Sequence, residues 1–149
     1  MYSAVLILHS WVRWLVLLAG VLALARAIAA GRTWTPADDR ATLFYTVALD
    51  VQFLLGLLLY VFLSPTVSLA FRNMGVAMQT TAIRFFVVEH VVGMVLALAV
   101  AHVARIRIRK AAPDAKGHTA AIFVGASLLL IVLAMPWPGL PYGRPLLRF

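Results

Sequence analysis

Two histidines lie near the starts of two long apolar stretches of this chain, where imidazoles can bind a metal. His9 is five residues into the first stretch, counted from Ala4, and His90 is seven residues into the third, counted from Ile83. With a helical rise of about 1.5 Å per residue, both should lie roughly 8–10 Å below the same membrane boundary. A histidine inside a membrane segment is costly unless it has a partner or a function. The pair therefore predicts a shared metal or haem.

A porphyrin held between these two rings would carry its iron at the same depth. Two imidazoles fill both axial positions and leave no open site for a substrate, which suits electron transfer. The propionates would reach toward the lipid headgroups or toward Arg84, near the start of the third stretch. Because facing helices of a bundle are a usual place for cofactors, we expect one haem b bound by His9 and His90.

Small residues follow the helix faces on which the histidines lie. Gly20 is eleven positions after His9, about 20° away around a helix, and Gly93 is three positions after His90. Small residues let a macrocycle approach closely, although glycines alone are more typical of ordinary packing between membrane helices. The second stretch adds a line of residues that could supply hydrogen bonds to a cofactor or quinone: Gln52, Gly56 and Tyr60.

A simpler interpretation gives both histidines a structural role. His9 could belong to an interfacial belt with Trp11 and Trp14, and His90 could form a hydrogen bond across helices. His102 does not add a second haem site, because it follows His90 by twelve residues and is offset by about 120°. We expect His102, and His118 in a connection, to lie at the membrane interface.

Four apolar stretches occupy most of the chain's 149 residues, of which 64% are hydrophobic. Ordinary globular chains are about half apolar, and roughly 20 apolar residues in helix cross a bilayer. We therefore expect a single all-α domain over residues 1–149, an integral membrane four-helix bundle that runs up-down-up-down. The absence of cysteine excludes disulfides and covalent haem attachment. The expected helices cover residues 4–30, 36–64, 82–110 and 117–135, followed by an irregular periplasmic tail, 136–149.

The basic residues predict the orientation of this bundle. Eight of the thirteen lie on one side, in the first and third connections: Arg26, Arg32, Arg40, Arg105, Arg107, Arg109, Lys110 and Lys116. The positive-inside rule places these connections in the cytoplasm and both termini in the periplasm of a bacterial inner membrane. Topology thus explains the formal charge of +8, and we expect no nucleic-acid partner.

Charged residues also fall inside the expected membrane region. Arg13 and Asp50 each lie nine residues in from opposite ends of neighbouring helices, so their depths roughly coincide. We expect an ion pair between them, because each charge alone would be expensive in the membrane. That pair could act as a clasp that sets helix register or as a proton relay. Glu89 is expected to pair with Arg13 or Arg84.

Local signals mark both ends of the second helix. Thr35 is a suitable N-cap, Pro36 suits the first helical position, and Asp38 favours the positive end of the helix dipole. Ser64 and Pro65 are expected to stop the same helix.

The chain resembles a family of small bacterial four-helix membrane proteins labelled cytochrome b-like. The likeness spans nearly the full length and implies His9 and His90 as haem ligands. Small b-type cytochromes with two haems carry more histidines on matched faces, and this sequence departs from them there. The resemblance is carried by Leu8-His9-Ser10 with Arg13-Trp14, Gln52 with Gly56 and Tyr60, Arg84-Phe85-Phe86, Glu89-His90, Gly93-Met94 and Pro136-Trp137-Pro138.

These features together predict a membrane b-type cytochrome or haem-carrying subunit that transfers electrons between the quinone pool and a periplasmic-side partner. No nucleophile, general-base arrangement or phosphate loop is evident, which favours an electron-transfer protein or subunit over a stand-alone enzyme. The rival interpretation is a non-catalytic accessory subunit of a larger respiratory or photosynthetic membrane complex, binding lipid, quinone or a chlorophyll-type pigment. A small transporter is less favoured, because the sequence lacks broken helices and repeated halves.

Overall fold

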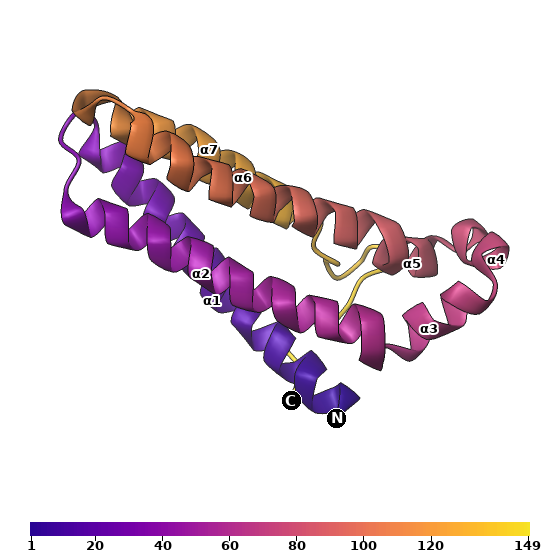
Figure 1. Ribbon diagram of the computed structural model, residues 1–149. Coiled ribbons are helices and arrows are strands. Elements are labelled where there is room, and N and C mark those ends of the chain that lie inside the picture. Colours follow the sequence, from indigo (N-terminus) through magenta and orange to yellow (C-terminus); the bar gives the residue numbers. More distant parts are fainter.

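Four helical spans, each long and apolar enough to cross a membrane, run back and forth in the computed structural model, which describes residues 1–149 (Figure 1). The first is α1 (Tyr2–Ala30), and the second is α2 (Pro36–Leu58) extended by the π-helical turn η1 (Leu59–Leu63). The third joins α5 (Thr81–Arg84), the π-helical turn η2 (Phe85–Glu89) and α6 (His90–Lys110). The fourth is α7 (Lys116–Leu133). The expected all-α four-helix bundle of membrane-spanning character is confirmed.

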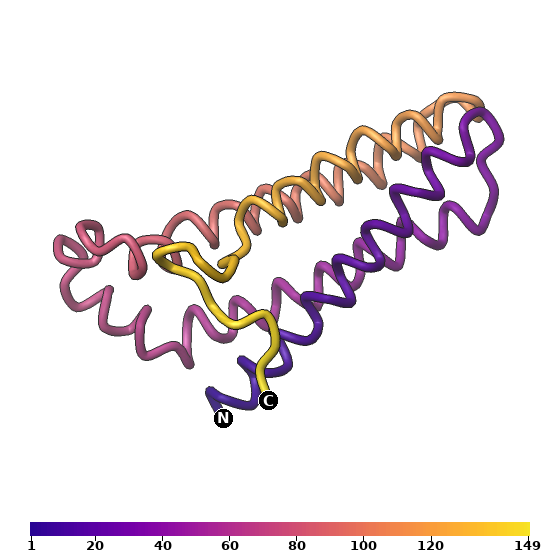
Figure 2. Tube along the Cα trace, turned by 180° about the vertical axis from the view of Figure 1, so that it is seen from behind, coloured from indigo at the N-terminus to yellow at the C-terminus, as the bar shows by residue number.

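Short helices and an irregular tail complete the chain. The connection between the second and third spans folds into α3 (Pro65–Arg72) and α4 (Met74–Gln79), whose N-caps are Ser64 and Asn73. A 3-10 turn, η3 (Pro113–Ala115), precedes α7. Both termini lie at the end of the bundle that carries α3 and α4, whereas the α1–α2 and α6–α7 connections lie at the opposite end (Figures 1 and 2).

The helices form a square in which α1 and α6 occupy opposite corners. α1 packs against α2 and α7, and α6 packs against α7 and α2. The α1–α2 pair and the α6–α7 pair diverge toward the end that carries the termini, and the tail crosses the space between them (Figure 2). This divergence makes room for a cavity that α1 and α6 face from opposite sides.

Small residues hold the middle of the bundle together. Ala23 and Ala97 are completely buried, and a Cβ at Gly20 would lie only 2.9 Å from the ring of Tyr45. The buried Tyr45 hydroxyl lies 2.8 Å from Ser127 Oγ, which donates to the carbonyl of Ala97 at 2.8 Å. Close backbone approach and cross-helix hydrogen bonds are typical of membrane helix packing, where lipid supplies no hydrophobic driving force.

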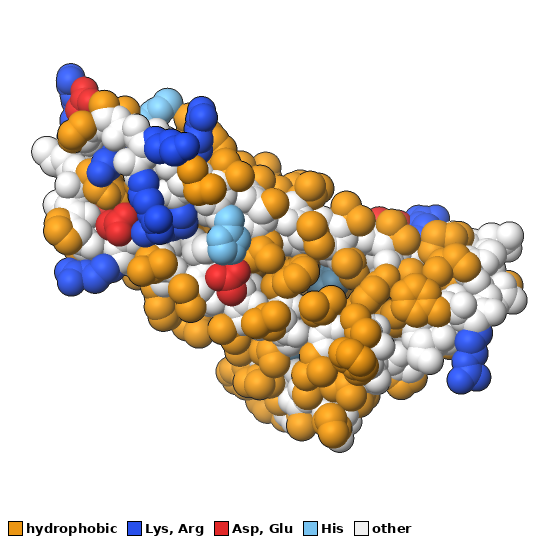
Figure 3. All heavy atoms as spheres, viewed as in Figure 1, with side chains coloured by type: hydrophobic (Ala, Val, Ile, Leu, Met, Phe, Trp, Pro, Cys, Tyr) orange, Lys and Arg blue, Asp and Glu red, His pale blue; other side chains and the backbone are white.

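Large apolar side chains cover the outside of the same helices. Leu18, Leu54 and Leu129 are each more than half exposed, which suits hydrocarbon rather than water. In Figure 3 apolar side chains cover most of the visible face, and basic side chains gather toward the end with the two short interhelical connections. The distribution supports a multi-pass membrane protein.

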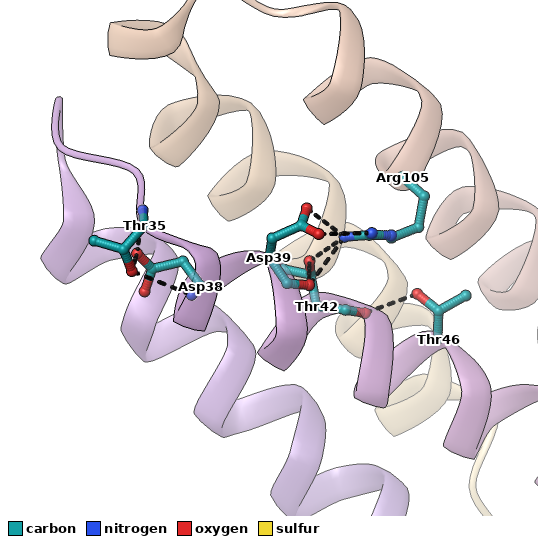
Figure 4. Close-up of polar contacts among 6 residues, drawn as sticks. All are labelled: Thr35, Asp38, Asp39, Thr42, Thr46 and Arg105. Atoms are coloured by element: carbon teal, nitrogen blue, oxygen red, sulfur yellow. Dashed lines mark hydrogen bonds and ion pairs between the residues drawn. The ribbon is translucent and has the colours of Figure 1, made fainter.

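The start of α2 is held by polar contacts that the sequence indicated (Figure 4). Thr35 is the N-cap, and it forms a capping box in which its side chain accepts from Asp38 N and the Asp38 carboxylate accepts from Thr35 N.

Arg105 of α6 reaches this region and donates to the Asp39 carboxylate at 3.0 and 3.2 Å and to Thr42 Oγ1 at 2.6 Å. Arg105 is only 8% exposed while the Asp39 side chain is 43% exposed, so these contacts join α2 to α6 at the edge of the bundle.

The prediction of an ion pair between Arg13 and Asp50 is wrong. Asp50 instead pairs with His102 of α6, whose Nε2 lies 2.8 Å from its carboxylate, and Arg13 donates to the tail carbonyl of Leu146. The helical rise per residue predicts how deep a side chain lies in the membrane, whereas its direction around the helix axis decides which helix it meets. Asp50 faces α6 rather than α1. The expected pairing of Glu89 is confirmed in one of its two forms, with Arg84 Nε 2.7 Å from Glu89 Oε1.

We predict that Arg105→Met lowers the free energy of unfolding by about 1.5–3 kcal/mol, the usual contribution of hydrogen bonds to charged groups. Arg32→Met is the matched control, because its ion pair with Asp114 is largely exposed and should contribute less than about 1 kcal/mol. Denaturant titration of both variants in detergent micelles measures the difference. Equal stability of the two variants would contradict a structural role for the Arg105 contacts.

Candidate functional site

A cavity of about 190 Å³ lies between the helices at the end that carries both termini. Its wall is built by α1, α2, η1, α3, η2, α6, α7 and the tail. Most of the wall is apolar, and the polar side chains that reach it include His9, Ser10, Gln52, Tyr60 and His90. The two sequence-predicted ligands therefore line the same cavity.

The imidazoles of His9 and His90 lie next to each other although they come from opposite corners of the bundle. Their ring centroids are 6.5 Å apart, and the ring planes make an angle of 79°. Both rings line the cavity, so no helix separates them there. The arrangement brings two imidazole rings together at one cavity.

His90 is oriented by the chain that follows α7. Its Nδ1 lies 2.8 Å from the carbonyl oxygen of Ala134, and since a carbonyl only accepts, Nδ1 carries the hydrogen. Nε2 is then the unprotonated nitrogen of the neutral ring. Phe85 and Phe86 pack around the imidazole at centroid distances of 5.9 and 6.2 Å. Donation of one ring N–H to a backbone carbonyl is the usual way in which a protein orients a metal-binding histidine.

His9 is held by the second helix. The Gln52 amide nitrogen donates to the His9 carbonyl oxygen at 3.0 Å and lies 3.3 Å from His9 Nε2. An amide N–H₂ can only donate, so Nε2 accepts and Nδ1 carries the hydrogen. Gly56 makes room for this ring, because a Cβ there would lie 3.1 Å from His9 Cε1. The predicted stripe of Gln52 and Gly56 thus positions His9.

Unpaired polar atoms concentrate at this cavity. Four buried side-chain nitrogen or oxygen atoms have no hydrogen-bond partner: His9 Nδ1, Arg13 Nε, Gln52 Oε1 and Arg105 Nε. The first three belong to residues that line the cavity. Buried polar groups are nearly always hydrogen-bonded, and exceptions commonly mark functional positions. The cluster supports a ligand site here more strongly than the two histidines do alone.

The two π-helical turns adjoin this site. Tyr60, which lies in η1, lines the cavity and donates its hydroxyl to the carbonyl of Val87, which lies in η2, at 3.0 Å. His90 directly follows η2. Single π-helical turns often occur at functional sites because they change the direction of the side chains that follow. Apolar sequence gives no signal for such turns.

The C-terminal tail closes the cavity from the side of α1. The indole N–H groups of Trp11 and Trp14 donate to the carbonyls of Arg148 and Leu146, both at 3.0 Å. Tyr142 stacks on Phe85 with ring centroids 3.7 Å apart. These contacts bring Arg144 and Arg148 to the cavity, where Arg13 of α1 also lies. Sequence reasoning missed the three arginines as a group, because nothing in the tail predicted where it would fold back.

Three other sequence-predicted site residues do not line this cavity. Arg84 is bonded to Glu89 and lines a separate pocket beside α7 and Tyr142. Gly20 packs on Tyr45 in the bundle core. A Cβ at Gly93 would meet that of Ala134 at 2.5 Å, so this glycine serves the close approach of α6 to the end of α7.

The residues present fit axial haem ligation better than they fit a bare metal ion. No group of three or more His, Cys, Asp or Glu side chains is close enough to hold a metal. A porphyrin brings its own equatorial nitrogens and needs only two axial ligands, which His9 and His90 could supply. Known small-molecule sites have volumes of about 300–1,000 Å³, so a macrocycle would also require the tail to move outward from the 190 Å³ cavity.

Comparison of the chain with protein-family models, with curated proteins and with solved structures finds no match. The likeness to cytochrome b-like membrane proteins therefore stays a prediction.

We predict that Gly93→Ala destabilises the bundle, because the added methyl would overlap that of Ala134. Overpacking typically costs about 1–3 kcal/mol. Gly125→Ala is the control, because its Cβ would meet Leu24 at an ordinary 3.6 Å and should gain up to about 1 kcal/mol of helix propensity. Thermal unfolding of both variants in micelles measures the effect. A Gly93→Ala variant as stable as Gly125→Ala would contradict the packing role.

Proposed function

We propose that this protein is a membrane-embedded b-type haem protein, with His9 and His90 as axial ligands, that carries electrons between a quinone pool and a partner at the end of the bundle bearing both termini. The observation that carries the proposal is the 6.5 Å separation of the two imidazole centroids. Two imidazole nitrogens, each about 2 Å from one metal, bring their ring centres to roughly 6 Å apart. Little rearrangement of α1 and α6 would then be needed for both rings to reach one iron.

The state of each ring supports the same role. The Ala134 carbonyl keeps the hydrogen of His90 on Nδ1, which leaves Nε2 as the ligand atom. His9 Nε2 lies against the Gln52 amide, so Gln52 must rotate to release it. The same rotation would give Oε1 of Gln52, which has no partner at present, the chance to accept a hydrogen bond. Gln52 is thus a positioning residue for His9.

The surroundings suit one-electron chemistry in the membrane. When bound, haem iron with two imidazole ligands supplies reversible one-electron transfer, and its potential depends on ligands and burial. The chain contributes the dry wall around that centre, which includes Phe53, Phe86 and Met94. Because both axial positions would be filled by histidines, the residues favour electron transfer over binding of a small substrate at the metal.

One observation favours the accessory-subunit alternative. The cavity volume of about 190 Å³ is below the usual range for drug-sized ligands, and a quinone ring needs less space than a porphyrin. His9, Gln52 and Tyr60 would then be hydrogen-bond partners for the quinone oxygens. In that case the protein would hold quinone or lipid for a larger membrane complex.

We predict that the purified protein, expressed with adequate haem supply, shows sharp Soret and alpha bands in its reduced-minus-oxidised spectrum. His9→Gly and His90→Gly should each lose most of the alpha band, because loss of one imidazole breaks axial ligation. Added free imidazole should restore the band in either variant if the helix still folds. His118→Gly, which changes an exposed histidine of the α7 N-terminal turn, is the matched control and should keep the wild-type spectrum.

A wild-type protein without these bands, even after addition of haem to the folded protein, would overturn the haem proposal. Bands that persist in both histidine variants would assign the ligands elsewhere. Retention of a quinone by a colourless protein, and its loss in Gln52→Leu, would support the alternative.

A further inference from the structure

We infer that Arg13, Arg144 and Arg148 form a binding site for the anionic group of an amphiphilic ligand whose apolar body occupies the cavity. The inference rests on the proposed function only for the identity of that ligand, whose carboxylates would then be the haem propionates. The shared chemistry is an oxyanion held by guanidinium groups beside an apolar chamber. The same chemistry would accept the phosphate of an anionic lipid.

The charge inventory of the chain leaves these arginines without an internal partner. The sequence has five carboxylate side chains. Four of them form ion pairs with other arginines: Asp38 with Arg26, Asp39 with Arg105, Glu89 with Arg84, and Asp114 with Arg32. The fifth, Asp50, has an oxygen 2.8 Å from His102 Nε2. No ion pair involves Arg13, Arg144 or Arg148. Six other basic side chains also lack an ion pair, but these three differ from them in lining the cavity.

Three cations at one membrane cavity need neutralisation. Charged side chains in membrane segments are costly, and they usually pair with a partner or mark a ligand pathway. Arg13 lies within α1, and it and the two tail arginines line a wall that is largely apolar. Like charges gathered at one cavity also repel one another. A bound anion would remove both penalties at once.

Most of the donors in this group are still free. Arg13 uses one nitrogen for Ser10 Oγ and the Leu146 carbonyl, while its buried Nε has no partner. Arg144 lies over the ring of Phe86, with its guanidinium carbon 4.8 Å from the centroid. The Arg148 side chain makes no hydrogen bond, and only its backbone carbonyl is used, by Trp11. A guanidinium offers five N–H donors in a planar fork that matches carboxylate or phosphate.

Arg72 shows that the cluster differs from an ordinary surface arginine at the same end. It ends α3 and does not line the cavity, whereas Arg144, which is exposed as Arg72 is, does line it. Water and headgroups can solvate such a charge without a specific ligand. The contrast makes Arg72 the matched control for the three cavity arginines.

The first test compares haem b with its dimethyl ester, in which both propionates are neutral. Titration of the full-length protein in neutral detergent, followed by the Soret band, should show the ester binding about 10- to 100-fold more weakly. In Arg144→Gln/Arg148→Gln the preference for free haem should shrink about tenfold or more. Arg148→Gln keeps the backbone carbonyl that holds Trp11, so the tail anchor remains. Arg72→Gln should keep the wild-type preference.

The second test replaces haem with lipid, so that failure of the haem proposal does not decide the arginine site. Thermal unfolding is measured in neutral detergent with added phosphatidylglycerol or phosphatidylcholine. If the protein binds no haem, phosphatidylglycerol should raise the unfolding temperature of the wild type and of Arg72→Gln, but not of the double variant. That result would overturn the haem function and support the anion site.

Two results would overturn the anion site itself. One is equal affinity of the wild type for haem b and for its dimethyl ester. The other, for a protein that binds no haem, is a phosphatidylglycerol effect that is absent or identical in the wild type and the double variant. The two proposals can also separate in the other direction. If the haem bands vanish in His9→Gly but the wild type binds the dimethyl ester as tightly as haem b, the haem function is supported and the arginine site is rejected.

Discussion

The shortage of carboxylates is the constraint on which the rest of this structure depends. Thirteen basic side chains share five acids; four of the acids are ion-paired with arginines, and Asp50 contacts His102. At the end with the short interhelical connections, Arg105 is satisfied by Asp39 and Thr42, and this contact ties α2 to α6. At the opposite end no acid remains for the arginines of the cavity. Both ends keep an excess of basic side chains, but only at the end bearing the termini do unpaired arginines line a cavity.

Helix packing separates the same two ends. Alanines and glycines let the backbones approach closely through the middle of the bundle, and the Tyr45–Ser127–Ala97 hydrogen bonds hold that region. Beyond it the α1–α2 and α6–α7 pairs diverge, and the tail enters the space between them (Figure 2). His9 and His90 can face each other because they occupy opposite helices of this widened region. The histidine pair and the arginine cluster are consequences of one opening in the bundle.

Sequence reasoning succeeded for quantities that depend on distance along a helix. Composition and length predicted four membrane-spanning helices, and counting residues placed His9 and His90 at similar depth, consistent with the 6.5 Å between their rings. It failed for Asp50, whose depth was compatible with Arg13 but whose direction was not, since it pairs with His102. Gly20 and Gly93 were predicted to share helix faces with His9 and His90, yet both serve helix packing away from the cavity. Two successive residues on a helix differ by about 100° in direction, so a small rotation exchanges partners.

The sequence alone determined that the chain forms four helices long and apolar enough to cross a membrane and that the two histidines lie near the same level, because hydropathy and helical rise are local properties. It also determined the capping of α2 by Thr35, since that contact spans only a few residues. Only the tertiary structure decided which groups surround the histidines. The tail arrives there through hydrogen bonds from Trp11 and Trp14 to residues more than 130 positions away, and the arginines meet only after that fold-back. No local pattern encodes such contacts, because they depend on how the helix pairs diverge and rotate.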